Sequence, residues 1–239
     1  MKNIKILLIT AFCLSITACI DGQPRRTVYG NKDVVKKERQ TDTFNGVRVS
    51  SGIDVFLSQG DKESVVVEAD ENLHEYIVTE NKGGILNVYS SANIREAAMK
   101  RVYVTMREIK SVMTSSAGDI IGETPFRSDF IELSASSAGN IKLEVTARHI
   151  KVAISSSGDI TLSGETDFLR ASLSSAGDLN AYNLKAKEAD ISASSAGDAD
   201  VYVTEKLTAR ASSAGDIYFR GNPGFIDTHS SSAGSIRKR

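Results

Sequence analysis

A five-residue motif, SSAGD or a close variant, recurs seven times in the second half of the chain and constrains the fold more than any other feature. Each copy centres on a glycine, and consecutive glycines lie 18 to 21 residues apart: Gly118, Gly139, Gly158, Gly177, Gly197, Gly215 and Gly234. Serine stands two and three positions before every one of them. The position after glycine holds Asp119, Asn140, Asp159, Asp178, Asp198, Asp216 and Ser235. A fixed period near twenty residues is the signature of a solenoid.

Apolar and polar residues alternate on both sides of each motif. Apolar residues stand eight, six and four positions before the glycine, as Ile150, Val152 and Ile154 do before Gly158. This period of two indicates strands with one face in the core. A coil of about 19 residues, at roughly 3.3 Å each, has a perimeter of about 60 Å, and stacked coils bury each other's apolar face. We therefore predict that residues 111–239 form a parallel β-helix whose coils contain a strand, a corner, a strand and a second corner.

The composition of the motif predicts the role of each position in a sharp corner. Glycine tolerates a positive φ and the close approach of a neighbouring backbone. Aspartate or asparagine closes a turn by accepting a hydrogen bond from a nearby backbone N–H group. The serine two positions before glycine is expected to form a buried ladder of hydroxyl groups between coils. The repeated Gly and Asp residues are therefore expected to be structural.

Residues 28–110 lack the regular period. We expect them to form the first coils and an elaborated cap, because the end of a solenoid needs a polar cover. Residues alternate around Ser50-Ser51-Gly52, which is interpreted as an early variant of the corner. Further strands are expected at 64–69 and 85–89, and short helices at 72–78 and 93–101.

The N-terminus has the organisation of a bacterial lipoprotein export signal. Two lysines precede a short apolar run at residues 6–16, which is too short to span a bilayer comfortably. The run ends in Ile16-Thr17-Ala18-Cys19, which resembles a lipobox. We expect residues 1–18 to be a signal peptide, Cys19 to carry the lipid that anchors the protein in the membrane, and residues 19–27 to form a tether. The expected location is the cell envelope, as an outer-membrane lipoprotein that is periplasmic or surface-exposed; the alternative is an ordinary signal peptide with an incidental cysteine.

Composition argues against several classes of function. Both cysteines, Cys13 and Cys19, precede the folded body, so a disulfide scaffold or a cysteine-bound zinc site is excluded there. A net charge of −1 gives no reason to expect nucleic acid as a partner. No cofactor or metal is expected. Calcium between the aspartates of successive coils is the alternative to turn closure, but one carboxylate per coil supplies few of the six to eight oxygens that Ca²⁺ takes.

No catalytic residues are expected. Polysaccharide lyases and hydrolases with a parallel β-helix need clustered carboxylates in one groove. Here the acids are spread one per coil, and His74, His149 and His229 occupy different positions in their units. No G-x-S-x-G motif accompanies the many serines.

The segment RVSSGIDVFLSQGDKESVVVEADENL (residues 48–73), followed by serial SSAGDI and SSAGNI corners, resembles the bacterial family called "putative autotransporter adhesin, head GIN domain". The resemblance runs from about residue 28 to residue 239. It implies a right-handed parallel β-helix in secreted or lipid-anchored proteins. It also implies adhesin-like binding of a protein or glycan ligand, which is an argument from fold alone. A structural envelope component that forms homo-oligomers, and a polysaccharide-processing enzyme, are the alternatives.

Overall fold

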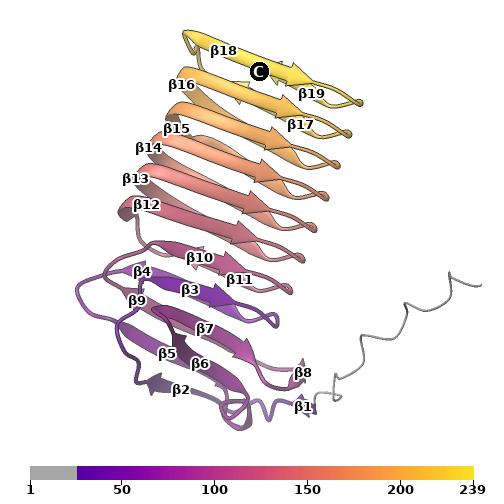
Figure 1. Cartoon of the computed structure of the whole chain (residues 1–239). Coiled ribbons are helices and arrows are strands. Elements are labelled where there is room, and N and C mark those ends of the chain that lie inside the picture. The colour runs from indigo at the N-terminus through magenta and orange to yellow at the C-terminus, as the bar shows by residue number, and fades with distance from the viewer. Residues whose placement is uncertain (1–25) are drawn as a thin grey trace, which may run out of the picture.

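The computed structural model describes residues 26–239, so the predicted signal peptide, Cys19 and most of the tether lie outside the described residues. The described chain forms a stack of β-strand coils, with its N-terminal and C-terminal parts at opposite ends (Figure 1). One continuous sheet contains 17 of the strands, and the remaining pair is β1 (Thr27–Tyr29) with β8 (Asn93–Glu96). The prediction of an all-β solenoid is confirmed, with about 7 turns and coils of about 19 residues. No helix within residues 26–239 has the length and hydropathy needed to cross a membrane.

Each regular coil has two walls joined by a tight corner. Wall 1 contains the strands that enter the corner, and wall 2 contains the strands that leave it. The first coils use separate strands: β3 (Gly46–Val49), β10 (Ser111–Thr114) and β12 (Phe126–Ala135) in wall 1, and β4 (Asp54–Gln59) and β11 (Asp119–Gly122) in wall 2. Four long strands then each form wall 2 of one coil and wall 1 of the next: β13 (Asn140–Ile154), β14 (Asp159–Leu173), β15 (Asp178–Ala193) and β16 (Asp198–Ala211). The stack ends with β17 (Asp216–Arg220) and β19 (Ser235–Lys238) in wall 2 and β18 (Phe225–Ser230) in wall 1.

Parallel pairing keeps equivalent residues in columns along the stack. Ile131 pairs with Ile150, and Ile150 pairs with Leu169. The inward columns of wall 1 are at most 2% exposed: Ile131, Leu133, Ala135, Ile150, Val152, Ile154, Leu169, Ala171 and Leu173. These are the columns that the period-two alternation predicts. Each coil therefore buries its apolar face only because another coil lies against it.

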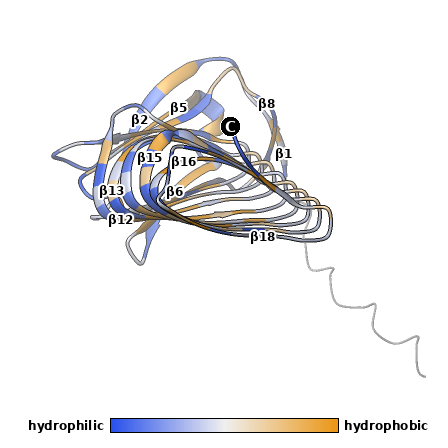
Figure 2. Ribbon diagram, turned by 90° about the horizontal axis from the view of Figure 1, so that it is seen from above, coloured by the Kyte–Doolittle hydropathy of each residue, from blue (hydrophilic) through white to orange (hydrophobic). Residues whose placement is uncertain are grey.

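The prediction of a second corner in each coil is wrong for the coils that contain β13 to β16. There the strand continues through a wide bend, which forms the rounded end of the cross-section opposite the narrow tips of the tight corners (Figure 2). No turn motif interrupts the strand at the bend, but the pairing shifts register there, between Thr161 and Ser163 and between Ala181 and Lys185. In β14 the bend contains Gly164 with φ +114°, where a Cβ would lie 2.2 Å from the carbonyl oxygen of Val145.

The N-terminal end is covered by strands with antiparallel pairing. The pairs are β2 with β5, β5 with β9, and β6 with β7. β7 and β9 also extend walls 1 and 2, because they pair in parallel with β3 and β4. These elements, which we call the cap, are β2 (Val34–Arg39), β5 (Ser64–Asp70), η1 (Glu71–Leu73), β6 (Ile77–Lys82), β7 (Ile85–Ser90) and β9 (Lys100–Met106).

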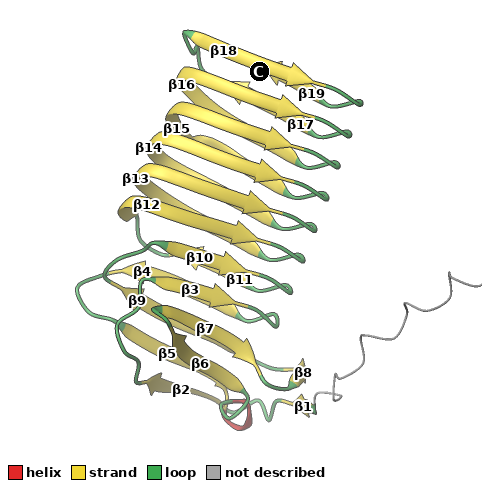
Figure 3. Cartoon of the chain, in the orientation of Figure 1, coloured by secondary structure: helices red, strands yellow, loops and turns green. Residues whose placement is uncertain are grey.

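The predicted short helices are wrong. Only the single 3-10 turn η1 forms at the start of the first segment, and the second contains β8 and the beginning of β9 (Figure 3). The backbone there finds partners in other strands: Asn93 pairs with Thr27, and Lys100 pairs with Ala69. Tertiary pairing overrides a weak local helix propensity. The strands predicted at 64–69 and 85–89 are present as β5 and β7.

Candidate functional site

The tight corner is made by two consecutive residues with positive φ, and neither is the glycine. At the corner before Gly177, Ser175 and Ala176 have φ values of 53° and 56°. The two residues before each of the other six corner glycines adopt the same conformation, and none of the corner glycines does. The expectation that these glycines supply a positive φ is therefore wrong. Serine and alanine bear the unfavourable left-handed conformation instead, held there by the packing and hydrogen bonding around them.

Glycine is required at the corner by the close approach of another coil. A Cβ on Gly158 would lie 2.6 Å from the carbonyl carbon of Ala135, and one on Gly177 would lie 2.7 Å from Cγ2 of Ile154. No side chain fits at such distances without moving the neighbouring coil. The remaining corner glycines, Gly118, Gly139, Gly197, Gly215 and Gly234, occupy the same place in their coils.

Backbone groups, and not aspartate side chains, close each corner. The N–H of Gly177 donates to the carbonyl of Ser174 over 3.2 Å, and the N–H of Ala176 donates over 3.1 Å to Ser195 of the next coil. Ser175 is exposed, as are the equivalent serines, because the positive φ turns their side chains outward. The predicted buried ladder of hydroxyl groups is thus replaced by a ladder of backbone hydrogen bonds.

Corner aspartates accept hydrogen bonds from the next coil, and Asp216 also accepts one from the hydroxyl of Tyr218 in its own strand over 3.5 Å. Asp198 accepts from the N–H of Asp216 over 3.1 Å, and Asp216 accepts from the N–H and hydroxyl of Ser235 over 3.1 and 2.7 Å. Within residues 26–239 no corner aspartate accepts a bond from its own turn, so the predicted turn closure is wrong. Pairing in register forms one column, the aspartate column: Asp54, Asp119, Asn140, Asp159, Asp178, Asp198 and Asp216.

Asp54 belongs to this column although the sequence motif did not reveal it. Gly52 has φ +61° and its N–H donates to Ser116 over 3.0 Å, so it occupies the place that Ala117 occupies in the next coil. Ile53, and not Gly52, therefore stands where the later corners have glycine. The sequence feature that could have assigned Asp54 to the column is the order Ser-Ser-Gly-Ile-Asp, in which the aspartate follows Gly52 by two residues.

The column concentrates negative charge on one edge. Burial, together with the charges of Asp159 and Asp198, raises the pKa of Asp178. Burial and the charge of Asp119 likewise raise the pKa of Asp54. In the part of the chain that the structure describes, no three His, Cys, Asp or Glu side chains gather closely enough to hold a metal ion.

The outer face of wall 1 carries charges that pair between coils. Lys151 lies 2.8 Å from Glu132, and Arg170 lies 3.7 Å from Asp190. These side chains are largely exposed, so each pair contributes little to stability. Because the strands pair in register, charged side chains recur on the outer face of wall 1 from one coil to the next.

Two buried ionisable groups lie in the cap. Asp70 is fully buried and accepts hydrogen bonds from the backbone N–H groups of Lys32 (3.0 Å), Ala98 (3.2 Å) and Met99 (2.9 Å). Burial works to raise the pKa of Asp70, but these donors hold it below its usual value. His74 is 5% exposed, and its Nε2 lies 3.1 Å from the carbonyl oxygen of Val35. Burial lowers the pKa of His74, against the effect of that hydrogen bond.

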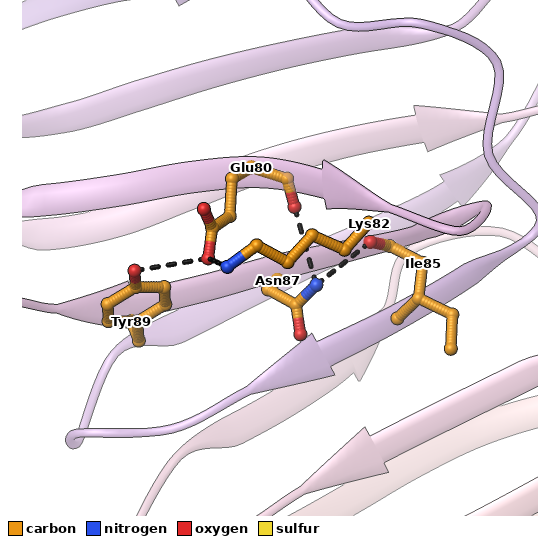
Figure 4. A network of polar contacts seen from close by, with 5 residues as sticks. All are labelled: Glu80, Lys82, Ile85, Asn87 and Tyr89. Carbon is orange, nitrogen blue, oxygen red and sulfur yellow. Dashed lines mark hydrogen bonds and ion pairs between the residues drawn. The ribbon is translucent and has the colours of Figure 1, made fainter.

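The hairpin of β6 and β7 has a half-buried polar network (Figure 4). One carboxylate oxygen of Glu80 accepts from Lys82 (2.7 Å) and from the hydroxyl of Tyr89 (3.1 Å). Asn87 donates to the carbonyls of Ile85 (3.0 Å) and Glu80 (3.4 Å). The hydrogen bond from Lys82 is the main reason that the pKa of Glu80 is low. Because every partner belongs to the same hairpin, the network is structural.

Several solved structures have the same fold as this chain. A protein described as a "putative adhesin" from Bacteroides fragilis NCTC 9343 matches with a TM-score of 0.84 at 19% identity, over 89% of this chain and 100% of that chain. A "putative adhesin" from Parabacteroides distasonis ATCC 8503 matches with a TM-score of 0.72 at 21% identity, over 89% and 100%. A "putative lipid binding protein" from the same strain matches with a TM-score of 0.75 at 24% identity, over 90% and 100%. The comparison with curated proteins found no match. The family model described as "Putative auto-transporter adhesin, head GIN domain" matches residues 43–223, and the chain belongs to this family.

Proposed function

We propose that this protein is a lipid-anchored, non-enzymatic component of the cell envelope that binds a protein or glycan ligand through the outer face of wall 1. Membership of an adhesin-like family supports a role in surface binding. The observation that carries the proposal is the ordered outer face of wall 1, where residues from successive coils stand in register. An extended surface of this kind suits a partner that makes the same contact on several coils.

The placement of ionisable groups favours binding over catalysis. His149 and His229 lie on the outer surface, in different columns of wall 1, while His74 is buried in the cap. The corner aspartates stand in a row with one carboxylate per coil, whereas acid–base chemistry requires converging groups.

Adhesion can be measured with beads that carry the purified chain. We expect the beads to bind intact bacterial cells or wells coated with mucin or collagen. The combined substitution of Lys151→Glu and Arg170→Glu on wall 1 should reduce this binding at least fivefold. Lys142→Glu with Arg237→Glu, which reverses two exposed charges on wall 2, is the matched control and should bind like the unmodified chain. No binding above beads coated with an unrelated protein, or equal losses from both variants, would contradict the proposal.

Anchoring is tested separately in cells, because Cys19 lies outside the described residues. We expect Cys19→Ala to abolish labelling by a fatty-acid probe and to remove the protein from the membrane fraction. Several acyl chains give stable membrane attachment where one is marginal. A variant that is still labelled and still sediments with membranes would show that the lipobox interpretation is wrong.

A further inference from the structure

Three aromatic rings form a strip on the outer face of wall 1. Phe130 pairs with His149, and His149 pairs with Phe168, so the three side chains follow one another along the stack. The ring centroids of His149 and Phe168 are 6.2 Å apart, with planes inclined by 60°. We call Phe130, His149 and Phe168 the aromatic strip. Each stands nine positions before its corner glycine. This is one position before the segment in which apolar residues alternate with polar ones.

The strip is not part of the core. Strand alternation directs its neighbours Ile131, Ile150 and Leu169 inward, where they are at most 1% exposed. Phe130 is 46% exposed, although burial of a phenylalanine side chain is worth about 1.5–3 kcal/mol. Aromatic side chains grouped at the surface mark a binding site more often than single ones do.

The charged side chains on each side of the strip form ion pairs with one another. On the side of the wide bend, Arg148 lies 3.6 Å from Asp129, and Lys187 lies 2.7 Å from Asp167. On the side of the tight corner, Lys151 lies 2.8 Å from Glu132. The strip therefore has no excess of either charge beside it. A ligand recognised here needs apolar surface and hydrogen-bonding groups, and has no need of net charge.

A hollow of about 290 Å³ lies beside the strip, at the wide bend. Its lining includes the hydroxyl-bearing residues Ser128, Thr146 and Thr166. It also includes five charged residues of both signs: Arg148, Glu165, Asp167, Lys185 and Lys187. Ser128 donates to the carbonyl oxygen of Phe130 over 2.8 Å, and Thr166 donates to that of Phe168 over 3.3 Å. Thr166 is only 4% exposed, so its hydroxyl bonds to the backbone and does not face a ligand. The hydroxyl oxygens of the half-buried Ser128 and the exposed Thr146 can accept hydrogen bonds from a ligand. The volume lies near the lower end of small-ligand sites, which span about 300–1,000 Å³.

We propose that the aromatic strip and this hollow bind a neutral glycan chain that runs along the solenoid axis. The C–H faces of sugar rings would pack on Phe130 and Phe168, as apolar surface packs on aromatic rings. Sugar hydroxyl groups would donate hydrogen bonds to the hydroxyl oxygens of Ser128 and Thr146. A repeating polymer matches a surface that presents a ring or a hydroxyl group on successive coils. A protein partner would instead be anchored by buried aromatic or arginine side chains in a dry pocket. The proposal rests on the proposed binding function of wall 1 and names its ligand class.

The direct test is affinity electrophoresis of the purified chain in gels containing neutral polysaccharides: dextran, a mixed-linkage β-glucan, a galactomannan and a mannan. We expect at least one to retard the chain. Phe130→Ala with Phe168→Ala should weaken that retardation at least tenfold. Circular dichroism should show that the variant remains folded, with a lower melting temperature because Phe168 is half-buried. Tyr29→Ala removes another exposed aromatic ring, from β1, and should bind like the unmodified chain. Retardation by none of the four, or equal retardation of the chain and the double variant, would overturn the proposal.

Two further measurements separate this proposal from the proposed function. If the beads adhere to cells but the double variant adheres equally well, the glycan proposal is wrong while adhesion through wall 1 stands. If the beads adhere to nothing, the proposed function itself is wrong. Binding to alginate or heparin that disappears at 0.5 M salt and is unaffected by the double variant would identify a charged ligand, and would also overturn the proposal.

Discussion

The side-chain amide of Asn140 donates a hydrogen bond of 2.8 Å to a carboxylate oxygen of Asp119 in the adjacent coil. Both residues belong to the aspartate column, and Asp159 follows Asn140 in register. An amide thus occupies a place that other coils fill with a carboxylate, and it replaces a contact between like charges with a hydrogen bond. Asparagine therefore fits at this position of the column, and it is favourable there because it removes repulsion between neighbouring carboxylates.

We expect Asp178→Asn to stabilise the protein at neutral pH. Two carboxylates about 4.8 Å apart repel by roughly 0.9 kcal/mol in water, so relief of the contacts with Asp159 and Asp198 should add on the order of 1 kcal/mol at low salt. The pKa of Asp178 is raised by burial and by these two neighbours. The stability that its protonated form contributes is therefore present below the unfolded pKa of 3.8 and is lost as pH rises through the folded pKa.

Urea unfolding of both proteins at pH 3 and pH 7 measures this effect. The gain from Asp178→Asn should be present at pH 7, smaller at pH 3 where the carboxyl group is already protonated, and reduced in 1 M salt. A loss of stability at pH 7 would mean that the carboxylate makes a stabilising contact that asparagine cannot replace.

Calcium should not stabilise the aspartate column. One carboxylate per coil offers too few oxygens for an ion that takes six to eight, and a ligand raises the melting temperature only by binding the folded state. Differential scanning fluorimetry with and without 5 mM Ca²⁺ should give the same melting temperature. An increase that a chelator reverses and that Asp178→Asn abolishes would establish a metal site at this edge.

Gly158→Ala should be strongly destabilising although alanine is the smallest change available. Its Cβ would lie 2.6 Å from the carbonyl carbon of Ala135, so the two coils must separate. We expect a loss of about 2 kcal/mol or more. Gly224→Ala is the matched control. The atom nearest to its Cβ would be the carbonyl oxygen of Glu205, 4.0 Å away. Similar melting temperatures for the two variants would argue against close backbone approach at the corner.

Ala176 tests the backbone conformation of the corner without a change in burial. The residue is exposed and has φ 56°, a conformation that β-branched side chains resist. Ala176→Val should cost about 1–3 kcal/mol. Ala176→Asn should stay within about 0.5 kcal/mol of the original, because asparagine visits this region more readily. Chemical denaturation measures both, and equal stability of the two variants would contradict the assignment of strain to Ala176.

His74 should make the cap sensitive to acid. Its pKa is lowered mainly by burial and further by Lys37 and Arg39. The folded state therefore binds fewer protons than the unfolded state, and stability falls as pH decreases below the unfolded pKa of 6.5. We expect the free energy of unfolding to decrease from pH 7.5 to pH 5.5, and His74→Gln to flatten this dependence. An unchanged slope in His74→Gln would assign the effect to another group.

The solenoid could be predicted from the sequence because its signals are periodic and redundant. The alternation that places Ile150 and Leu169 in the core recurs in every coil, and parallel pairing in register follows from matching one coil to the next. A departure from the pattern in one coil leaves the period evident from the other coils. The helix predicted at 93–101 is wrong because these residues pair with β1 and β5, segments far away in the sequence. The helix predicted at 72–78 is wrong because β6 begins at Ile77, which pairs with Ser90.

The sequence by itself determined which residues face the core and how often the corners recur, because both depend on the period of the chain. Tertiary structure decided what each corner residue does. Ser175 and Ala176 hold the positive φ because Gly177 is needed where the neighbouring coil passes. Asp198 bonds to Asp216, and Phe130 meets His149, only across a boundary between coils. The physical reason is that conformation at a corner is set by hydrogen bonds and contacts with the coils above and below, which are about twenty residues away in the sequence and only one strand spacing of roughly 4.8 Å away in space.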